Sequence, residues 1–168
     1  VLDKFAVATD GFMVLGTTTF TIGVVTTTPL STSSANYTNT LAPLALNLQG
    51  QTGSELSYNT IGTAPNRTLV VQWKGYRRSA ITGDNINFQV RLNEADNSVE
   101  YVYGTVVCTS ATSVAAQVGL RGANNLVNTS VLTRSLQQGW AATTTGTTNA
   151  STVSFGQSFA PASGTTLK

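Results

Sequence analysis

The sequence predicts an all-β protein, an antiparallel β-sandwich with jelly-roll topology. Roughly ten to twelve short apolar runs are separated by turn residues, at the spacing of ~8–12 residues that is typical of sandwiches. No stretch of about ten residues keeps the apolar period of 3.6 that marks a helix, so the helical crossovers of a parallel α/β sheet are missing. Threonine is abundant, and its branched side chain suits a pleated strand better than a helix.

The N-terminal third contains a predicted hairpin and two further strands. Apolar runs occupy residues 5–8, 12–15, 20–25 and 41–48. Asp10 and Gly11 join the first two runs, and both residue types tolerate the positive φ of a tight turn. Residues 26–40 are rich in Thr, Ser and Asn and indicate a loop. Pro43 lacks the amide hydrogen that a ladder needs, so its strand is expected at a sheet edge or to begin there.

The middle of the chain has the clearest strand pattern. Strands are predicted at residues 55–61, 67–76, 85–93 and 99–103. In the second of these, Trp73 lies on the apolar phase, whereas Gln72 and Lys74 lie on the polar phase. Tyr101 and Tyr103 share one face of the last strand, and we expect them in the core with their hydroxyls at its rim. These strands are therefore expected to have one dry face and one wet face.

The C-terminal third is less regular. Strands are predicted at residues 114–120, 131–136 and 152–159. Gly119 and Gly122 favour a strand over a helix for the first of these segments. A chain of 168 residues is long enough to bury a core and fits one domain, which we assign to residues 1–168.

Low charge and the absence of histidine exclude several classes of function. Only 10% of the residues are charged, against ~25% in typical soluble domains, and the net charge is +2. Arg77 and Arg78 form the only adjacent basic pair, and neighbours on a strand point to opposite faces, so no nucleic-acid partner is expected. No apolar run approaches the ~20 residues that span a bilayer, so no membrane insertion is expected. The absence of His removes His-dependent triads and most zinc sites.

The acidic residues give no clear catalytic pair. A glycosidase needs two carboxylates that face each other ~5–10 Å apart. Glu55, Glu94 and Glu100 are the candidates, but the last two lie on the polar phase of their strands, with Arg91 near enough to pair with them. Serine chemistry without His would need a Ser-x-x-Lys motif, and the chain has none. We therefore expect no catalytic residues and no enzymatic activity.

Two clusters of oxygen-bearing residues are candidates for binding calcium. Asp84 and Asn87 lie in the first cluster, and Glu94 and Asp96 lie in the second. Carboxylate and amide oxygens suit Ca²⁺, but neither cluster matches an EF-hand loop. Asp and Asn in hairpin turns usually serve the backbone conformation. We therefore expect no cofactor, and these four residues are the candidates if calcium binds.

Trp140 is the candidate ligand-binding residue. It follows Gly139 and precedes a Thr-rich loop, where an exposed ring could stack on the face of a sugar. Cys108 is the only cysteine, so no intramolecular disulfide forms, and we expect it to be a small buried apolar residue. The other residues of a binding site are unknown from the sequence.

Several short motifs resemble β-sandwich modules of large secreted proteins from Bacteroidetes-type bacteria. The central motifs are PNRTLVVQWK (65–74), NFQVRLNE (87–94) and VEYVYG (99–104). Further matches lie at residues 7–12, 41–44, 118–122 and 161–165. The same order is distantly similar to the nidogen-type extracellular domain. The resemblance covers residues 5–168 and begins inside the domain, so one or two N-terminal strands are expected to be missing from this chain.

The resemblance implies an exported module, extracellular or at the cell surface, in proteins that carry adhesin repeats and a sorting domain for the type IX secretion route. It supplies no catalytic residues. The implied function is that of a non-enzymatic module of an adhesin or surface filament, which binds a glycan or protein on a surface, contacts neighbouring domains or acts as a structural spacer. The alternatives are an accessory domain of a secreted hydrolase and a self-assembling shell or capsid jelly-roll subunit.

Overall fold

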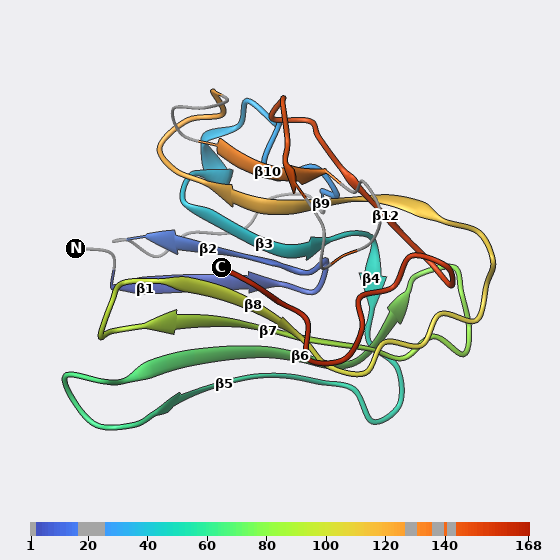
Figure 1. Ribbon diagram of the computed structural model, residues 1–168, viewed down its shortest axis with the longest axis horizontal. Helices are drawn as coiled ribbons and strands as arrows, with labels where there is room; N and C mark the ends of the chain where they lie inside the picture. Colours follow the sequence, from blue (N-terminus) through green and yellow to red (C-terminus); the bar gives the residue numbers. More distant parts are fainter. Residues whose placement is uncertain (1–2, 17–25, 127–130, 136–139, 141–143) are drawn as a thin grey trace.

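The computed structural model describes residues 3–16, 26–126, 131–135, 140 and 144–168. They form two antiparallel β-sheets that pack face to face (Figure 1). The described residues contain no α-helix, and no helix among them could span a bilayer; a 3₁₀ turn, η1 (Ala35–Tyr37), precedes β3 (Thr40–Ala45). The predicted all-β sandwich is confirmed. The strand expected at residues 20–25 lies outside the described residues.

Seven described strands form the first sheet. Their order is β1-β2-β3-β9-β10-β11, and β12 also pairs with β9. The strands are β1 (Lys4–Ala8), β2 (Phe12–Gly16), β3 (Thr40–Ala45), β9 (Val114–Arg121), β10 (Val131–Ser135), β11 (Thr144–Thr145) and β12 (Val153–Phe155). The strands predicted at residues 114–120 and 131–136 are thus present.

Six described strands form the second sheet, in the order β13-β8-β7-β6-β4, with β5 also paired to β6. The strands are β4 (Leu48–Gln49), β5 (Glu55–Ile61), β6 (Thr68–Arg78), β7 (Ile86–Asn93), β8 (Val99–Tyr103) and β13 (Thr166–Leu167). Strands β5 to β8 follow one another as a meander, as β1 to β3 do in the first sheet. A jelly roll links its two sheets through Greek-key crossings. In the strand order found here, more neighbouring strands are consecutive in the chain than in a jelly roll.

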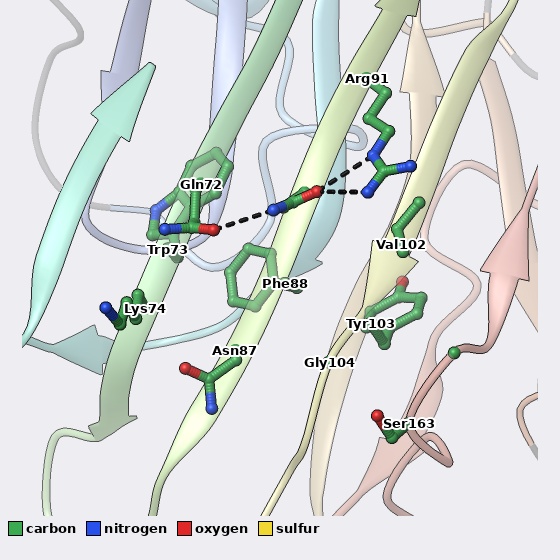
Figure 2. A pocket seen from close by; sticks show the side chains of 12 residues that line it. Gln72, Trp73, Lys74, Asn87, Phe88, Arg91, Val102, Tyr103, Gly104 and Ser163 are labelled. Carbon is green, nitrogen blue, oxygen red and sulfur yellow. Dashed lines mark hydrogen bonds between the residues drawn. The ribbon is translucent and has the colours of Figure 1, made fainter. Parts of the chain in front are cut away.

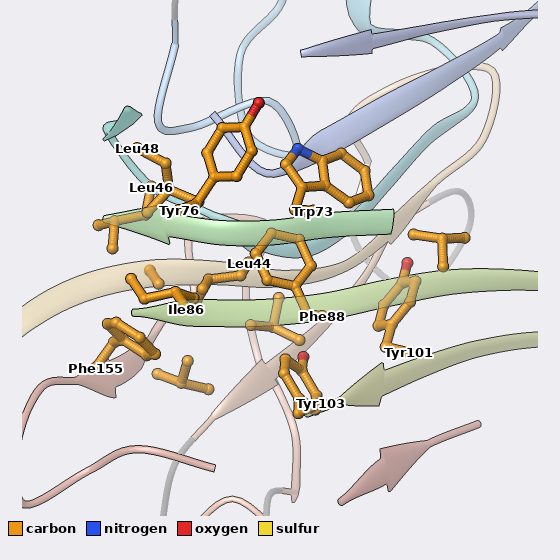
Figure 3. Close-up of a cluster of buried hydrophobic side chains, with 14 of the residues drawn as sticks. Leu44, Leu46, Leu48, Trp73, Tyr76, Ile86, Phe88, Tyr101, Tyr103 and Phe155 are labelled. Carbon is orange, nitrogen blue, oxygen red and sulfur yellow. The ribbon is translucent and has the colours of Figure 1, made fainter. Parts of the chain in front are cut away.

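The core lies between the two sheets, on alternate residues of each strand. Trp73, Phe88 and Tyr103 come from β6, β7 and β8, and each is at most 1% exposed. The rings of Trp73 and Phe88 stack with their centroids 4.9 Å apart (Figure 3). Leu44 and Phe155 join the same cluster from the first sheet. The predicted core position of Trp73 is confirmed.

Two tyrosine hydroxyls bond across the core from the second sheet to the first. The Tyr101 hydroxyl donates to the carbonyl of Gly119 at 2.6 Å, and the Tyr103 hydroxyl donates to the carbonyl of Pro43. Both tyrosines are buried, so these hydrogen bonds satisfy hydroxyls that water does not reach. The expectation that the hydroxyls lie at the rim of the core is therefore wrong.

Pro43 lies inside the first sheet, and the expectation of an edge position is wrong. β3 runs between β2 and β9, and all six of its residues are buried. The register against β9 shifts between Ala42 and Ala45. Pro43 therefore falls in a bulge, where the chain does not have to donate a ladder hydrogen bond.

The outer face of the first sheet is covered by residues 26–39, which we call the covering segment (Figure 1). Leu30 and Tyr37 of this segment form a second apolar cluster with Phe12 and Val14 of β2 and with two alanines of β3. The inner residues of the same strands belong to the main core. Strands β2 and β3 are thus buried on both faces.

Two buried side chains of β9 hold the covering segment by its main chain. Gln117 accepts a hydrogen bond from the amide of Leu30 at 3.0 Å. The Arg121 guanidinium donates to three carbonyls of the segment, those of Pro29, Thr32 and Ser34. Both side chains are at most 3% exposed, and burial lowers the pKa of Arg121. Gln117 and the two Nη atoms of Arg121 therefore bond to the covering segment, while Nε of Arg121 has no partner among the described residues.

The outer face of the second sheet has no such cover among the described residues. Gln72, Gln89 and Arg91 are half-buried there, and Lys74 is exposed. The edge strand β5 is exposed over most of its length, with Tyr58 at 68%. On this face the polar side chains of the sandwich therefore remain accessible to solvent.

Candidate binding face on the second sheet

A hollow of about 320 Å³ lies on the outer face of β6, β7 and β8 (Figure 2), and we call it the β6–β8 hollow. Its volume is at the lower end of the range of small-molecule sites, ~300–1,000 Å³. Its polar lining residues are Gln72, Lys74, Asn87, Gln89, Arg91 and Ser163. Three aromatic residues also border the hollow, but they belong to the core and are at most 1% exposed. The hollow therefore presents hydrogen-bonding groups rather than aromatic faces for stacking.

Strand alternation and register together build this polar surface. Gln72 and Lys74 flank the buried Trp73 on β6, and Gln89 and Arg91 flank the buried Val90 on β7. Alternate residues point to opposite faces, so the same alternation that fills the core places the polar side chains outside. The register pairs Gln72 directly with Gln89. Two amides on neighbouring strands thereby come within hydrogen-bond reach.

A chain of hydrogen bonds joins three of these side chains (Figure 2). Arg91 donates from Nε and Nη2 to Oε1 of Gln89, at 3.0 and 2.9 Å. Nε2 of Gln89 in turn donates to Oε1 of Gln72 at 2.8 Å. Arginine has only donors, so it fixes the orientation of both amides. The NH₂ group of Gln72 is left as an available donor, with no partner among the residues that the structure describes.

Asn87 lines the hollow, but both polar atoms of its side chain already form hydrogen bonds within the protein. β6 has a bulge between Trp73 and Tyr76, and Gly75 adopts a φ of 69° there, which glycine reaches at little cost. The bulge removes the Gly75 amide from the ladder, and Oδ1 of Asn87 accepts its hydrogen at 2.9 Å. Nδ2 of Asn87 donates to the carbonyl of Thr105 at 2.7 Å. Asn87 is therefore a structural residue of this face.

A second hollow, of about 340 Å³, lies between β5 and β6 on the same face. Its lining residues are Glu55, Ser57, Tyr58, Asn59, Val70 and Gln72. Gln72 therefore belongs to both hollows. The Glu55 carboxylate lies 3.9 Å from Nζ of Lys74, and both side chains are more than half exposed. The polar surface thus runs from the edge strand to β8.

Trp140, the residue expected to contact a ligand, is a core residue in the structure. It is 3% exposed, and Nε1 of its indole donates to the carbonyl of Phe159 at 2.6 Å. Its ring packs edge-on against Tyr103 and Phe155, with centroids 5.1 and 6.0 Å away. A buried ring has no face to offer to a sugar, so a binding hypothesis has to depend on other residues.

Two of the calcium candidates, Asp84 and Asn87, are engaged by protein groups. The Asp84 carboxylate is buried and accepts hydrogen bonds from Nε of Arg78 at 2.6 Å and from the amide of Thr109 at 2.8 Å. Burial raises the pKa of Asp84, but the hydrogen bonds from Arg78 and Thr109 outweigh it and hold the pKa below its usual value. Asp84 and Arg78 thus form a buried ion pair that ties the loop after β6 to the segment before β9.

The other two calcium candidates lie in the turn between β7 and β8, and each has a cation beside it. Glu94 pairs with Arg67 at 2.6 Å, and Asp96 pairs with Lys168 at 3.0 Å. Within the described part of the chain, no three His, Cys, Asp or Glu side chains are grouped so that they could hold a metal ion. The expectation of no cofactor, with these four residues as the candidates if calcium binds, stays a prediction.

The glutamates considered as a catalytic pair also lie in ion pairs or beside cations. Glu100 lies 3.6 Å from Nζ of Lys168, while Glu94 bonds with Arg67. Arg91 is opposite Glu100 in the register of β7 and β8, but it donates its hydrogen bonds to Gln89. The expected pairing of Arg91 with these glutamates is therefore not found. Cys108 is buried as expected, and burial raises the pKa of its thiol to about 11.

The unit formed by Gln72, Gln89 and Arg91 was not expected from the sequence. The alternation of β6 and β7 does place all three on the polar phase of their strands. The sequence does not give the register between these strands, which are joined by a loop rather than a tight turn. Without the register, nothing indicates that the two glutamines meet. A glutamine on the polar phase of each of two successive strands is the only available signal.

A family model described as NIDO related matches residues 1–168. Searches of curated proteins and of solved structures gave no match. The match spans the whole chain, including both hollows and the strands that carry them.

Proposed function

Because the chain belongs to the NIDO-related family, which suggests an extracellular module, we propose that it is a non-enzymatic module that binds a glycan on a surface. The β6–β8 hollow is the proposed binding site. On the resemblance of its motifs, the parent protein would be a secreted adhesin or surface filament, in which neighbouring domains flank this module.

The hydrogen-bonded chain of Arg91, Gln89 and Gln72 carries the proposal. A sugar presents hydroxyls that both donate and accept hydrogen bonds, and amide and guanidinium groups match this pattern. The three side chains hold one another in place on rigid strands before any ligand arrives, which lowers the entropic cost of binding. A surface built only for solubility does not need such an internally bonded array.

The proposal of a non-enzymatic role has separate support. The chain has no His, and the Glu94 and Asp96 carboxylates lie in ion pairs on the surface. A general acid needs a pKa raised towards neutrality, whereas the pKa values of Glu94 and Asp96 are lowered to about 2, chiefly by hydrogen bonds from Arg67 and Ser98 respectively.

A glycan array probed with the purified chain tests the proposal. We expect binding to a subset of glycans, and we expect Gln89→Ala to weaken it by roughly tenfold or more, because the substitution removes the link between Gln72 and Arg91. Gln157→Ala is the matched control, since Gln157 is exposed and lies outside both hollows.

Two outcomes would refute the proposal. The first is the absence of binding to every glycan on the array. The second is glycan binding that is equal in the wild-type chain and the Gln89→Ala variant, since the site would then lie elsewhere. Urea denaturation of both variants verifies that folding is unchanged, because substitutions of side chains outside the core usually alter stability by only about 0.5 kcal/mol.

A further inference from the structure

The charged residues of the β6–β8 hollow are all cationic. Lys74 and Arg91 line it, and no Asp or Glu does. The whole chain carries nine basic and seven acidic residues, so the molecule has little charge bias. The hollow is thus a local positive site on a nearly neutral protein.

The Arg91 guanidinium is oriented but only partly used. Nε and Nη2 both donate to the same oxygen of Gln89, which fixes the plane of the group. Arg91 takes part in none of the ion pairs between described residues. The guanidinium has five N–H donors in a rigid fork, so the donors on Nη1 and the second donor on Nη2 are left for a ligand.

The neutral lining residues also present donors more than acceptors. Oε1 of Gln72 and Oε1 of Gln89 accept hydrogen bonds within the chain, which leaves the NH₂ group of Gln72 facing outward from it. Both functional atoms of Asn87 are bonded to the protein. The Lys74 ammonium adds three donors and no acceptor. Apart from the Ser163 hydroxyl, which both donates and accepts, the lining therefore favours a ligand that supplies acceptors.

The nearest acids do not cancel this charge. Glu55 lies 3.9 Å from Lys74 but lines the neighbouring hollow. Glu100 is opposite Arg91 in the register, yet it lies 3.6 Å from Nζ of Lys168 and does not line the β6–β8 hollow. The Glu55–Lys74 contact is exposed, where one ion pair contributes little, and the half-buried Glu100 carboxylate lies beside a cation of its own.

We propose that the β6–β8 hollow binds a sugar that carries a carboxylate, with Arg91 as the anchor of that carboxylate. The planar carboxylate matches the remaining N–H groups of the guanidinium, and Lys74 adds a second positive charge. The NH₂ group of Gln72 then donates to a ring or hydroxyl oxygen of the same sugar. This inference rests on the proposed function, because it names the class of glycan for the same site.

Two matched ligand pairs test the charge requirement by isothermal titration calorimetry with the purified chain. Oligogalacturonate is compared with its methyl ester, which removes the charge of each carboxyl group and adds only a methyl. Sialyllactose is compared with its own carboxyl methyl ester. We expect the acid of at least one pair to bind about tenfold or more tightly than its neutral partner, and the pair that responds distinguishes uronic acids from sialic acids.

Arg91→Gln is the decisive variant. It should reduce the affinity for the acidic ligand about tenfold or more and remove the preference over the neutral partner. Arg91→Lys keeps the charge but loses the fork, so we expect it to recover only part of the affinity. Arg67→Gln is the matched control, because Arg67 is a surface arginine outside the hollow.

The outcomes separate this inference from the proposed function. Equal affinity for the acid and its neutral partner, or an unchanged preference in Arg91→Gln, overturns the carboxylate inference and leaves glycan binding intact. Tighter binding of a neutral glycan from the array than of either acid overturns it as well. If no glycan binds at all, both the inference and the proposed function fail.

Discussion

The outer faces of the two sheets carry the same pair of residue types in opposite circumstances. On the first sheet, Gln117 and Arg121 are at most 3% exposed and bond to main-chain groups of the covering segment. On the second sheet, Gln89 and Arg91 are partly exposed and bond to each other. Residue type alone therefore does not distinguish a structural pair from a pair left open to solvent.

The two faces differ in the hydrogen-bond partners of their arginines. Arg121 is surrounded by carbonyls of a single loop, so its donors serve to fold residues 29–34 onto β9. Arg91 donates two hydrogen bonds to the amide oxygen of Gln89, and its remaining N–H groups are open to solvent. A buried polar group is costly unless it is bonded, whereas an exposed one costs little to leave open. Substitutions on the two faces should therefore affect different properties.

Gln117→Ala is expected to give the largest loss of stability. It leaves the Leu30 amide without its acceptor, removes the hydrogen bond to the carbonyl of Asn149, and opens a cavity in a fully buried place. We expect a loss of roughly 2–4 kcal/mol in the free energy of unfolding, measured by urea denaturation. Gln89→Ala on the open face should change it by no more than about 0.5 kcal/mol. Equal losses for the two variants would contradict the comparison.

Arg121→Lys is expected to give an intermediate loss. A lysine ammonium is a single point with three donors, and it does not reproduce the two Nη atoms that reach the carbonyls of Pro29, Thr32 and Ser34. Leaving one or more buried carbonyls unpaired should cost roughly 1–3 kcal/mol in urea denaturation. Arg91→Lys should have no measurable effect in the same assay. A loss in Arg91→Lys as large as in Arg121→Lys would show that the open face also supports the fold.

The smallest expected effect is the pH dependence of an exposed ion pair beside the open face. A hydrogen bond from Arg67 lowers the pKa of Glu94 to about 2, from an ordinary value of 4.5. A lowered pKa means that the ionised form favours the folded state, so this contribution is present above pH ~4.5 and is lost as the pH falls towards 2. The pair is exposed, so the effect on stability is small.

Urea midpoints measured at pH 6 and at pH 2.5 test this expectation. The wild-type chain should lose slightly more stability between the two pH values than Arg67→Gln does, because the variant lacks the partner that lowers the pKa of Glu94. A larger acid-induced loss in the variant than in the wild-type chain would contradict it.

Much of the fold could be predicted from the sequence because alternation records which side of a strand is buried. Residues 67–76 and 85–93 show this, since their apolar phases carry Trp73 and Phe88 into the core. The edge position expected for Pro43 was wrong because its bulge depends on the register between β3 and β9, which the local sequence does not indicate. The expectation of further N-terminal strands stays a prediction.

The candidate site was less accessible to sequence reasoning than the fold. In the sequence, Trp140 is an isolated aromatic residue beside a polar loop, which favours an exposed ring. In the structure it fills the core next to Tyr103. The contacts of Trp140 come from segments distant in the chain, which composition does not reveal. Gln72 and Gln89 are 17 residues apart and meet only through the pairing of β6 with β7. The periodicity of the sequence therefore predicts which residues are buried, but it predicts only weakly which residues of neighbouring strands are in contact.

The way Arg121 holds the covering segment has a consequence for protein engineering. The guanidinium recognises carbonyl oxygens, which every amino acid possesses, so it does not depend on the side chains of the residues that it anchors. Exposed positions such as Ser33, Ala35 and Asn36 could accept new side chains while the main-chain path stays fixed. This segment covers the opposite side of the sandwich from the β6–β8 hollow. A peptide tag or a second recognition sequence could be grafted there without competing with a bound ligand.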